Sequence, residues 1–262
     1  MEFTSAQISA WVGAYFWPFL RIGAMLLVAP VFGARMVPKP VRIGLGLAIT
    51  VVVAPLLPAM PVVDALSPEG VLIVVHQLLI GVAMGFALQL VFGALVTAGQ
   101  TVAMSMGLGF AALVDPQNGI QVPVISQYYL ISSTLLFLVL NGHLQLIQMV
   151  ADSFHTLPIA ATGLPRDALW DLVIWATQMF AGALMVALPA ITAIMLVNLA
   201  LGVMTRAAPQ LNIFSVGFPI TLLGGFAIIM LTLPSMGPQF TELMDGAMAL
   251  VRDMVAGAPA HG

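Results

Sequence analysis

Residues 197–225 read VNLALGVMTRAAPQLNIFSVGFPITLLGG, which sets a short polar stretch between two long apolar runs. Asn198, Gly202 and Arg206 are spaced four apart, which places them within about 80° of arc on one face of a helix. An amide, a missing side chain and a guanidinium on an otherwise apolar helix favour a close helix contact held by polar groups. We therefore expect these three residues to form a polar clasp.

The tip of this stretch contains residues that end one helix and begin another. Pro209 ends the first helix, because a proline inside a helix removes a backbone hydrogen bond and clashes with the preceding turn. Gln210 and Asn212 can satisfy the backbone groups freed there, and Gly217 and Pro219 are expected to shape the start of the returning helix. The stretch predicts an αα-hairpin with a compact polar tip.

The chain as a whole is far more apolar than a soluble protein. Of its 262 residues, 61% are hydrophobic and 6% are charged, and the mean hydropathy is +1.11. A helix needs about 20 apolar residues to cross a bilayer, and longer tracts here contain no Asp, Glu, Lys or Arg. These tracts are 70–114, 116–151, 172–205 and 207–241. They predict one all-α, polytopic membrane domain with apolar helices at 8–32, 42–60, 70–96, 124–150, 171–205 and 212–236.

The densest positive charge lies in residues 33–42, where Arg35, Lys39 and Arg42 accompany two prolines. Basic residues beside membrane spans favour the cytoplasmic side. Counting six crossings from this point places Arg206 on the cytoplasmic side and both termini on the other side.

The residue inventory argues against several chemistries. A net charge of −3 without a basic run offers no surface for nucleic acid. With no cysteine and four scattered histidines, we expect no metal site. Nucleophile elbows, phosphate loops and dinucleotide fingerprints are missing from the sequence, so we expect neither a cofactor nor an enzymatic activity.

Arg21 is a charged residue inside the first apolar segment. A mid-membrane arginine costs about 2.5–3.5 kcal/mol, which the ten Leu, Ile, Phe and Val residues within 11–32 can offset. Two interpretations are open. The side chain snorkels or pairs with a neighbouring subunit, or it takes a direct part in transport.

Residues 239–255 read QFTELMDGAMALVRDMV and are amphipathic. Apolar residues recur there at helical spacing, and the charged residues lie mostly elsewhere around the helix. The apolar positions are Phe240, Leu243, Met244, Ala247, Val251 and Met254. We expect a tail helix that lies at the membrane interface or packs against a subunit, with recognition of a partner as the alternative.

A second unusual stretch, residues 101–129, is apolar but contains many helix breakers. The breakers are Gly107, Gly109, Asp115, Pro116, Asn118, Gly119 and Pro123. Lipid cannot satisfy non-helical backbone groups, so the stretch must be buried in protein or line a watery cavity. We interpret it as re-entrant or pore-occupying, with Met106 and Phe110 as bulky sealing residues. The alternative is an apolar loop packed on its own helices.

Four stretches, in order along residues 15–236, resemble one family. Residues 197–225 are similar to the signature of the FliR family of flagellar export proteins, which is related to the T subunit of injectisome secretion systems. The other three are RIGAMLLVAPVFGARMVPKPVRIGLGLAI (21–49), GVAMGFALQLVFGALVTAGQTVAMSMGLGFAALVDPQNG (81–119) and FLVLNGHLQLI (137–147).

The resemblance implies a subunit of the type III secretion export gate, in a hetero-oligomer with FliP, FliQ and FlhB homologues. Residues 1–170 would be similar to FliP and residues 171–236 to the FliQ hairpin, followed by the tail 239–255. The hairpin tip, 205–214, would meet the FlhB homologue at the cytoplasmic entrance. Residues 106–123 would be a plug that blocks the central channel until unfolded flagellar proteins pass.

The same resemblance implies a place in the bacterial inner membrane, in contact with lipid, at the flagellar basal body. It also implies bent helices, with which Pro189 is consistent. Other functions stay open on the residues alone. They are a secondary transporter built on broken helices, an injectisome export-gate subunit and a purely structural membrane scaffold.

Overall fold

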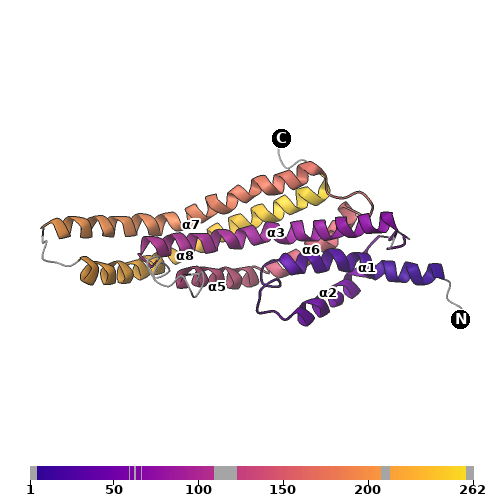
Figure 1. Ribbon diagram of the computed structural model, residues 1–262, viewed down its shortest axis with the longest axis horizontal. Helices are drawn as coiled ribbons and strands as arrows, with labels where there is room; N and C mark the ends of the chain where they lie inside the picture. The colour runs from indigo at the N-terminus through magenta and orange to yellow at the C-terminus, as the bar shows by residue number, and fades with distance from the viewer. Residues whose placement is uncertain are drawn as a thin grey trace. The chain divides into compact units, whose positions relative to one another are not determined.

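The computed structural model describes residues 5–58, 60–61, 63–65, 67–108, 123–207 and 213–257. Figure 1 shows its helices, which are α1 Ser5–Val28, α2 Lys39–Val53, the 3-10 helix η1 Ala54–Leu56, α3 Pro68–Ser105, α5 Val124–Val139, α6 Gly142–Thr156, α7 Arg166–Ala207 and α8 Ile213–Ala256. Helices and connecting turns make up these residues, and no strand occurs among them. The all-α prediction is confirmed.

Local side chains explain how α2 and α3 are held at their starts. At α3, the Ser67 hydroxyl accepts a hydrogen bond from the Gly70 N–H at 3.0 Å and so caps the first turn. At α2, Arg42 Nε donates to the Phe32 carbonyl oxygen at 2.9 Å. Arg42 therefore fastens α2 to the loop that precedes it.

The helix predicted at 124–150 is two helices, α5 and α6. The backbone is left-handed at Asn141, whose φ is 56°, and the two helices are bent by 64° there. A Cβ at Gly142 would overlap the Phe137 ring, so glycine is required directly after the turn. An Asn-Gly pair typically indicates a turn, but the apolar residues around it favoured one continuous helix in the sequence prediction.

Two helices are longer than predicted. α3 continues past residue 96 to Ser105, and α8 runs without interruption to Ala256. Residues 239–255 are thus the last turns of α8 rather than a helix of their own. α8 begins at Ile213, one residue from the predicted start, and Gly217 and Pro219 lie within its first two turns.

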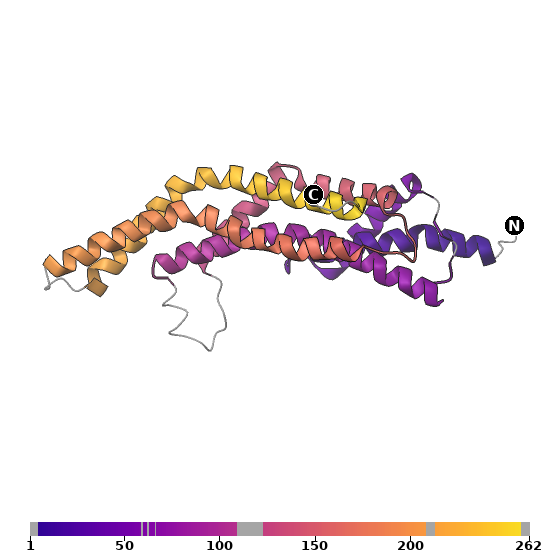
Figure 2. The same ribbon diagram turned by 90° about the horizontal axis from the view of Figure 1, so that it is seen from above.

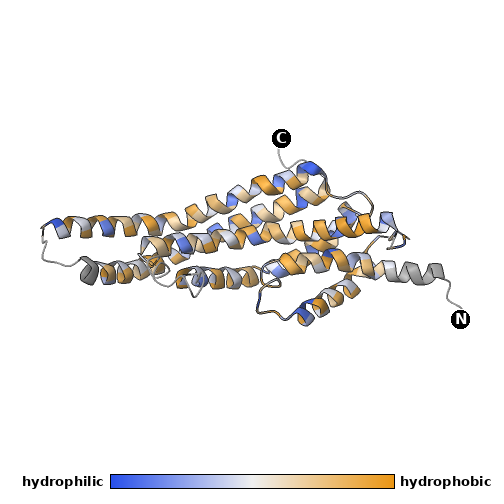
Figure 3. Ribbon diagram, viewed as in Figure 1, coloured by the Kyte–Doolittle hydropathy of each residue, from blue (hydrophilic) through white to orange (hydrophobic). Residues whose placement is uncertain are grey.

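Among the residues that the structure describes, four or five candidate spans are found, against the six crossings predicted. Four helical ranges are long and apolar enough to cross a membrane: Lys39–Leu56, Pro68–Ser105, Arg166–Ala207 and Gly217–Ala256. The bent pair of α5 and α6 would add a fifth span, whereas the described apolar part of α1, Gly13–Val28, is shorter. Figure 3 shows apolar residues along most of α3, α7 and α8, with hydrophilic residues at both ends of α7.

The chain divides into two compact units. Unit 1 comprises residues 1–90, 137–177 and 244–262, and unit 2 comprises residues 91–136 and 178–243. Four helices, α3, α5, α7 and α8, contribute residues to both units.

In unit 1, α1 packs closely on the first half of α3. A Cβ added at Gly81 or Gly85 would lie too close to the carbonyl oxygens of Arg21 and Met25. Small residues at this spacing let two helix backbones approach, as in membrane helix pairs. The largest fully buried apolar side chains of these two helices in unit 1 include Trp17, Ile22, Met25, Leu26, Ile73, Ile80, Met84 and Leu88.

In unit 2, the second half of α3 packs with α5, α7 and α8. The Phe92 and Phe240 rings meet edge to face with centroids 5.9 Å apart, and a Cβ at Gly99 would lie 2.8 Å from the Ser126 Cα. α7 and α8 lie side by side as an antiparallel pair (Figures 1 and 2). The predicted αα-hairpin is confirmed for its two helices, whereas residues 208–212 of its tip lie outside the described part.

Candidate functional site

Arg21 forms a polar cluster inside unit 1. Its side chain is fully buried, and Nε donates to Gln77 Oε1 at 2.8 Å. Nη1 donates to the Ser153 carbonyl oxygen at 2.9 Å and to Ser153 Oγ at 3.0 Å. Nη2 donates to the Leu157 carbonyl oxygen at 2.9 Å. One guanidinium therefore joins α1, α3 and the end of α6.

The acceptors explain how a charge is held here without a carboxylate among the residues that bond it. Ser153 and Leu157 lie at the C-terminal end of α6, where the helix dipole is negative, and the Ser153 carbonyl oxygen also accepts from Leu157 N at 2.9 Å. A cation is stabilised at that position. The Phe154 ring adds a face 4.3 Å from the guanidinium carbon. Arg21 thus acts as the C-terminal cap of α6.

These hydrogen bonds bear on both interpretations of Arg21, as a snorkelling or subunit-paired residue and as a residue that takes part in transport. All the bonds described lie within one chain and span 56 to 136 residues, so the side chain neither snorkels nor needs a neighbouring subunit to satisfy it. Its acceptors are an amide, a hydroxyl and backbone carbonyls. None of them ionises readily, which favours a structural role over a direct part in transport.

The end of α3, residues 105–108, forms a second cluster in unit 2, which we call the α3 terminus. Gly107 N donates to Met104 O and Leu108 N donates to Ala103 O, both at 3.0 Å. This bond pattern, with Gly107 at φ 82°, is a Schellman motif that closes the helix. Gly107 is needed here because other residues rarely adopt this φ. The helix breaker found in the sequence therefore ends α3 at a defined place.

Side chains of α7 and α8 hold the α3 terminus. Asn198 Nδ2 donates to the Ser105 carbonyl oxygen at 3.4 Å, and Asn198 Oδ1 accepts from Thr221 Oγ1 at 3.3 Å. Met106 is fully buried, and a Cβ at Gly225 of α8 would overlap its side chain. The hairpin and the α3 terminus thus make one joint.

Comparison with known proteins gives a consistent result over nearly the whole chain. Residues 12–247 match the model of a family described as bacterial export proteins, family 1. Flagellar biosynthetic protein FliR of Escherichia coli strain K12 is 40% identical over 259 residues, which are 99% of each chain. FliR of Pectobacterium carotovorum subsp. carotovorum is 42% identical over 255 residues, 97% of each chain. FliR of Bacillus subtilis strain 168 is 28% identical over 247 residues, covering 93% of this chain and 95% of its own.

The chain belongs to the FliR family of bacterial export proteins.

Within this FliR-family chain, the residues predicted to form the polar clasp are not equivalent. Asn198 bonds other parts of its own chain, whereas Gly202 has no atom near the position of a Cβ and Arg206 is exposed in the last turn of α7. The Gly217 carbonyl oxygen, at 2.9 Å, shares the single Thr221 hydroxyl proton with Asn198 Oδ1, and Pro219 is exposed. Pro209, Gln210 and Asn212 lie outside the described residues.

The predicted plug is described only at its two ends. Met106 and Gly107 belong to the α3 terminus, and Pro123 immediately precedes α5, where its carbonyl oxygen accepts from Gln127 N at 3.1 Å. The remaining predicted plug residues, Gly109, Phe110, Asp115, Pro116 and Gly119, lie outside the described residues.

Several partners in the two clusters were not found from the sequence. They are Gln77, Ser153 and Leu157 around Arg21, Ser105 and Thr221 around Asn198, and Gly225 beside Met106. A polar residue in a long apolar run, such as Gln77, is a usable signal, because burial requires a hydrogen-bonding partner. The local sequence does not indicate which residue is that partner.

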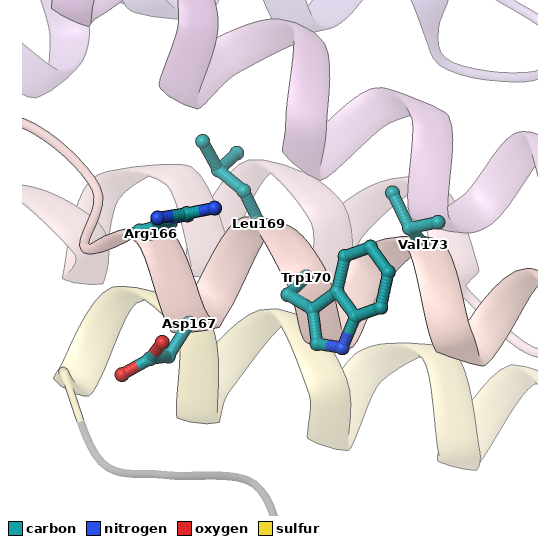
Figure 4. A pocket seen from close by; sticks show the side chains of 5 residues that line it. All are labelled: Arg166, Asp167, Leu169, Trp170 and Val173. Carbon is teal, nitrogen blue, oxygen red and sulfur yellow. The ribbon is translucent and has the colours of Figure 1, made fainter.

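The described residues contain no group of three or more His, Asp or Glu side chains placed to hold a metal ion. A hollow of about 470 Å³ lies at the start of α7 and is lined by Arg166, Asp167, Leu169, Trp170 and Val173 (Figure 4). All five side chains come from one helix, with Leu169 and Val173 on one side of it and Asp167 and Trp170 on the other (Figure 4). This is an open surface rather than a site with converging polar groups.

Proposed function

We propose that this chain is a structural and gating subunit of the flagellar type III export gate in the bacterial inner membrane. The observation that carries the proposal is its 40% identity to Escherichia coli FliR, a flagellar biosynthetic protein, over 99% of both chains. The long apolar helices support a membrane location. The chain would assemble with FliP, FliQ and FlhB homologues at the flagellar basal body and contribute to flagellum assembly.

In this proposal, residues 106–123 are the plug of the central channel. The support lies at the α3 terminus, where Gly107 ends the helix and Met106 is anchored on α8. The chain therefore leaves α3 from a defined place rather than from a frayed helix end. The plug would block the lumen at rest and be displaced as an unfolded flagellar protein passes.

The hairpin 171–236 would play the part that FliQ plays elsewhere in the gate, with residues 1–170 in the FliP-like part. Arg206, exposed near the end of α7, is available to a partner such as the FlhB homologue. A secondary transporter would require ionisable pairs in its apolar core. Arg21 is bonded to neutral acceptors, which argues against that alternative.

The decisive experiment removes residues 110–118 and leaves Gly107 and Pro123 in place, so that α3 and α5 keep their ends. We expect the membrane to leak small ions or solutes, because the lumen would lose its obstruction, while the chain still co-purifies with FliP and FliQ homologues. Ion flux into vesicles that contain the purified complex measures the leak.

A matched control replaces the same nine residues by a Gly-Ser sequence of equal length, which keeps the connection but removes the bulky side chains. It should leak as well if side chains form the seal. Unchanged ion flux and unchanged secretion in both variants would refute the plug. Failure to co-purify with FliP and FliQ homologues in the unaltered chain would refute the export-gate proposal as a whole.

A further inference from the structure

A second hollow lies in unit 1 between α6 and the last turns of α8. It has a volume of about 450 Å³. Gln145, Gln148, Asp152 and Thr156 line it from one face of α6, and Arg252 lines it from α8. Two different helices thus direct polar side chains of both charge signs into one space, in a chain that is only 6% charged. The proposed function makes no use of this pocket.

The two charged side chains in this pocket are exposed and do not pair with each other. Asp152 and Arg252 make no hydrogen bond and no ion pair with any residue that the structure describes. A carboxylate and a guanidinium that share a pocket without pairing leave each charge free for a ligand. A ligand with a single negative charge would suit Arg252 but be repelled by Asp152, and a simple cation would meet the reverse problem.

The floor of the pocket is apolar. Met149, Met248 and Val255 also line it, and their side chains are buried with 6%, 2% and 4% exposure. A volume of a few hundred Å³ with an apolar floor and a few polar groups is typical of a site for a small amphipathic group. The lining therefore fits a ligand with a charged end and an apolar neighbour.

The sequence of the two helices places this pocket where apolar segments become charged. α8 has no charged residue before Glu242 and then carries Asp245, Arg252 and Asp253. α5 and α6 together have none before Asp152. Charged side chains are expensive in hydrocarbon but favourable at lipid headgroups, where basic residues meet phosphate. The pocket lies where the sequences of both helices change from apolar to charged, which is the pattern of a helix that passes from hydrocarbon to headgroups.

We propose that this pocket binds a zwitterionic group of the phosphoethanolamine type. Arg252 would bond the phosphate, and the Gln148 amide N–H would add a donor to it. Asp152 would accept from the ammonium group, and the apolar floor would cover the carbon chain next to the phosphate. This chemistry is found in a phospholipid headgroup and in free phosphoethanolamine.

The test uses the full-length chain in nanodiscs that contain equal amounts of phosphatidylethanolamine, phosphatidylglycerol and phosphatidylcholine. After release into mild detergent, native mass spectrometry counts the lipids that stay bound. We expect phosphatidylethanolamine to be retained about tenfold over phosphatidylglycerol, and Arg252→Gln and Asp152→Asn each to lower its retention about tenfold. Phosphatidylcholine should be retained less, because its quaternary ammonium has no N–H to donate to Asp152.

Arg166→Gln and Asp245→Asn are matched controls, because both residues are exposed in the same unit but do not line the pocket. They should leave retention unchanged, and Arg252→Lys should keep most of it. Calorimetric binding of free phosphoethanolamine separates the two sources. Binding that Arg252→Gln abolishes supports a soluble ligand, and retention of the lipid alone assigns the headgroup. Equal retention of the anionic lipid, or retention unaffected by either pocket variant, would overturn the proposal.

Discussion

The Arg21 cluster and the α3 terminus are both polar groups in an apolar chain, but they are built differently. Arg21 is fully buried and makes four hydrogen bonds of 2.8 to 3.0 Å. Asn198 is exposed, and its two bonds are 3.3 and 3.4 Å long. Short bonds in a buried site are strong, whereas long bonds at an exposed site contribute little. We infer that the Arg21 cluster holds α1, α3 and α6 together firmly, and we call it the fixed joint. The α3 terminus can separate from α7 and α8 at a low cost in free energy, and we call that contact the separable joint.

The largest expected effect is that of Arg21→Ala, which would break the fixed joint. The substitution removes the donor from Gln77 Oε1, from Ser153 and from the partly buried Leu157 carbonyl, and it leaves a cavity in a buried site, so we expect a loss of about 3 kcal/mol in the free energy of unfolding. Thermal unfolding of the purified chain in detergent measures it. Arg21→Lys should recover only part of the lost stability, because a lysine ammonium cannot donate hydrogen bonds in the planar arrangement of a guanidinium.

Arg42→Ala is the control for that measurement. Arg42 also donates to backbone carbonyls, but at the partly exposed loop that contains Phe32 and Ala34. We expect a loss below about 1 kcal/mol. Similar losses for the two arginines would show that burial does not distinguish the clusters as we infer.

An intermediate effect is expected from Gly225→Ala, which would force the α3 terminus away from α8. The new Cβ would overlap the Met106 side chain, whereas Gly224→Ala places its Cβ in open space. Both changes improve helix propensity by about 1 kcal/mol, so their difference isolates the contact with Met106. We expect Gly225→Ala to be less stable than Gly224→Ala by about 1–2 kcal/mol in denaturant unfolding. Equal stability would mean that Met106 moves aside freely and does not anchor the α3 terminus.

The smallest effect is expected from Asn198→Ala, which removes the weak bonds of the separable joint. Global stability should fall by less than about 1 kcal/mol. Amide hydrogen exchange at residues 106–108 should rise by up to about fivefold, because the α3 terminus opens locally without global unfolding.

Thr192→Ala is the matched control for Asn198→Ala, since Thr192 is exposed on the same helix and bonds only the Leu188 carbonyl oxygen of its own helix. It should leave exchange at residues 106–108 unchanged. A loss of stability after Asn198→Ala as large as that after Arg21→Ala would remove the contrast between the two joints.

The membrane class and the hairpin were predictable because they depend on composition and periodicity. Residues 70–114 and 172–205 are apolar tracts long enough for long helices, and α3 occupies the first as far as Ser105 while α7 occupies the second. Helix ends were less predictable. Residues 212–236 and the tail 239–255 were predicted as two separate helices, yet α8 continues through both, with Pro219, Pro234 and Pro238 inside it. A proline removes one backbone hydrogen bond, and packing of the surrounding helix outweighs that local loss.

The polar residues were recognisable, but their partners were not. Arg21 and Asn198 were singled out because polar groups are rare in this sequence, and both do take part in polar clusters. We expected the clasp to combine Asn198, Gly202 and Arg206 because they share a helix face. The described contacts involve only Asn198, since a shared face does not reveal which other element lies opposite each turn.

By itself, the sequence determined that the chain is an all-α, membrane-type member of the FliR family and that residues 171–236 form a hairpin of two helices. These features follow from local hydropathy, backbone restrictions and motifs, which act within a few residues of one another. Only the tertiary structure decided that Arg21 caps α6, that Asn198 and Gly225 hold the α3 terminus, and that Asp152 and Arg252 share a pocket. Those pairings join residues far apart in the chain, and they depend on which helix faces pack together.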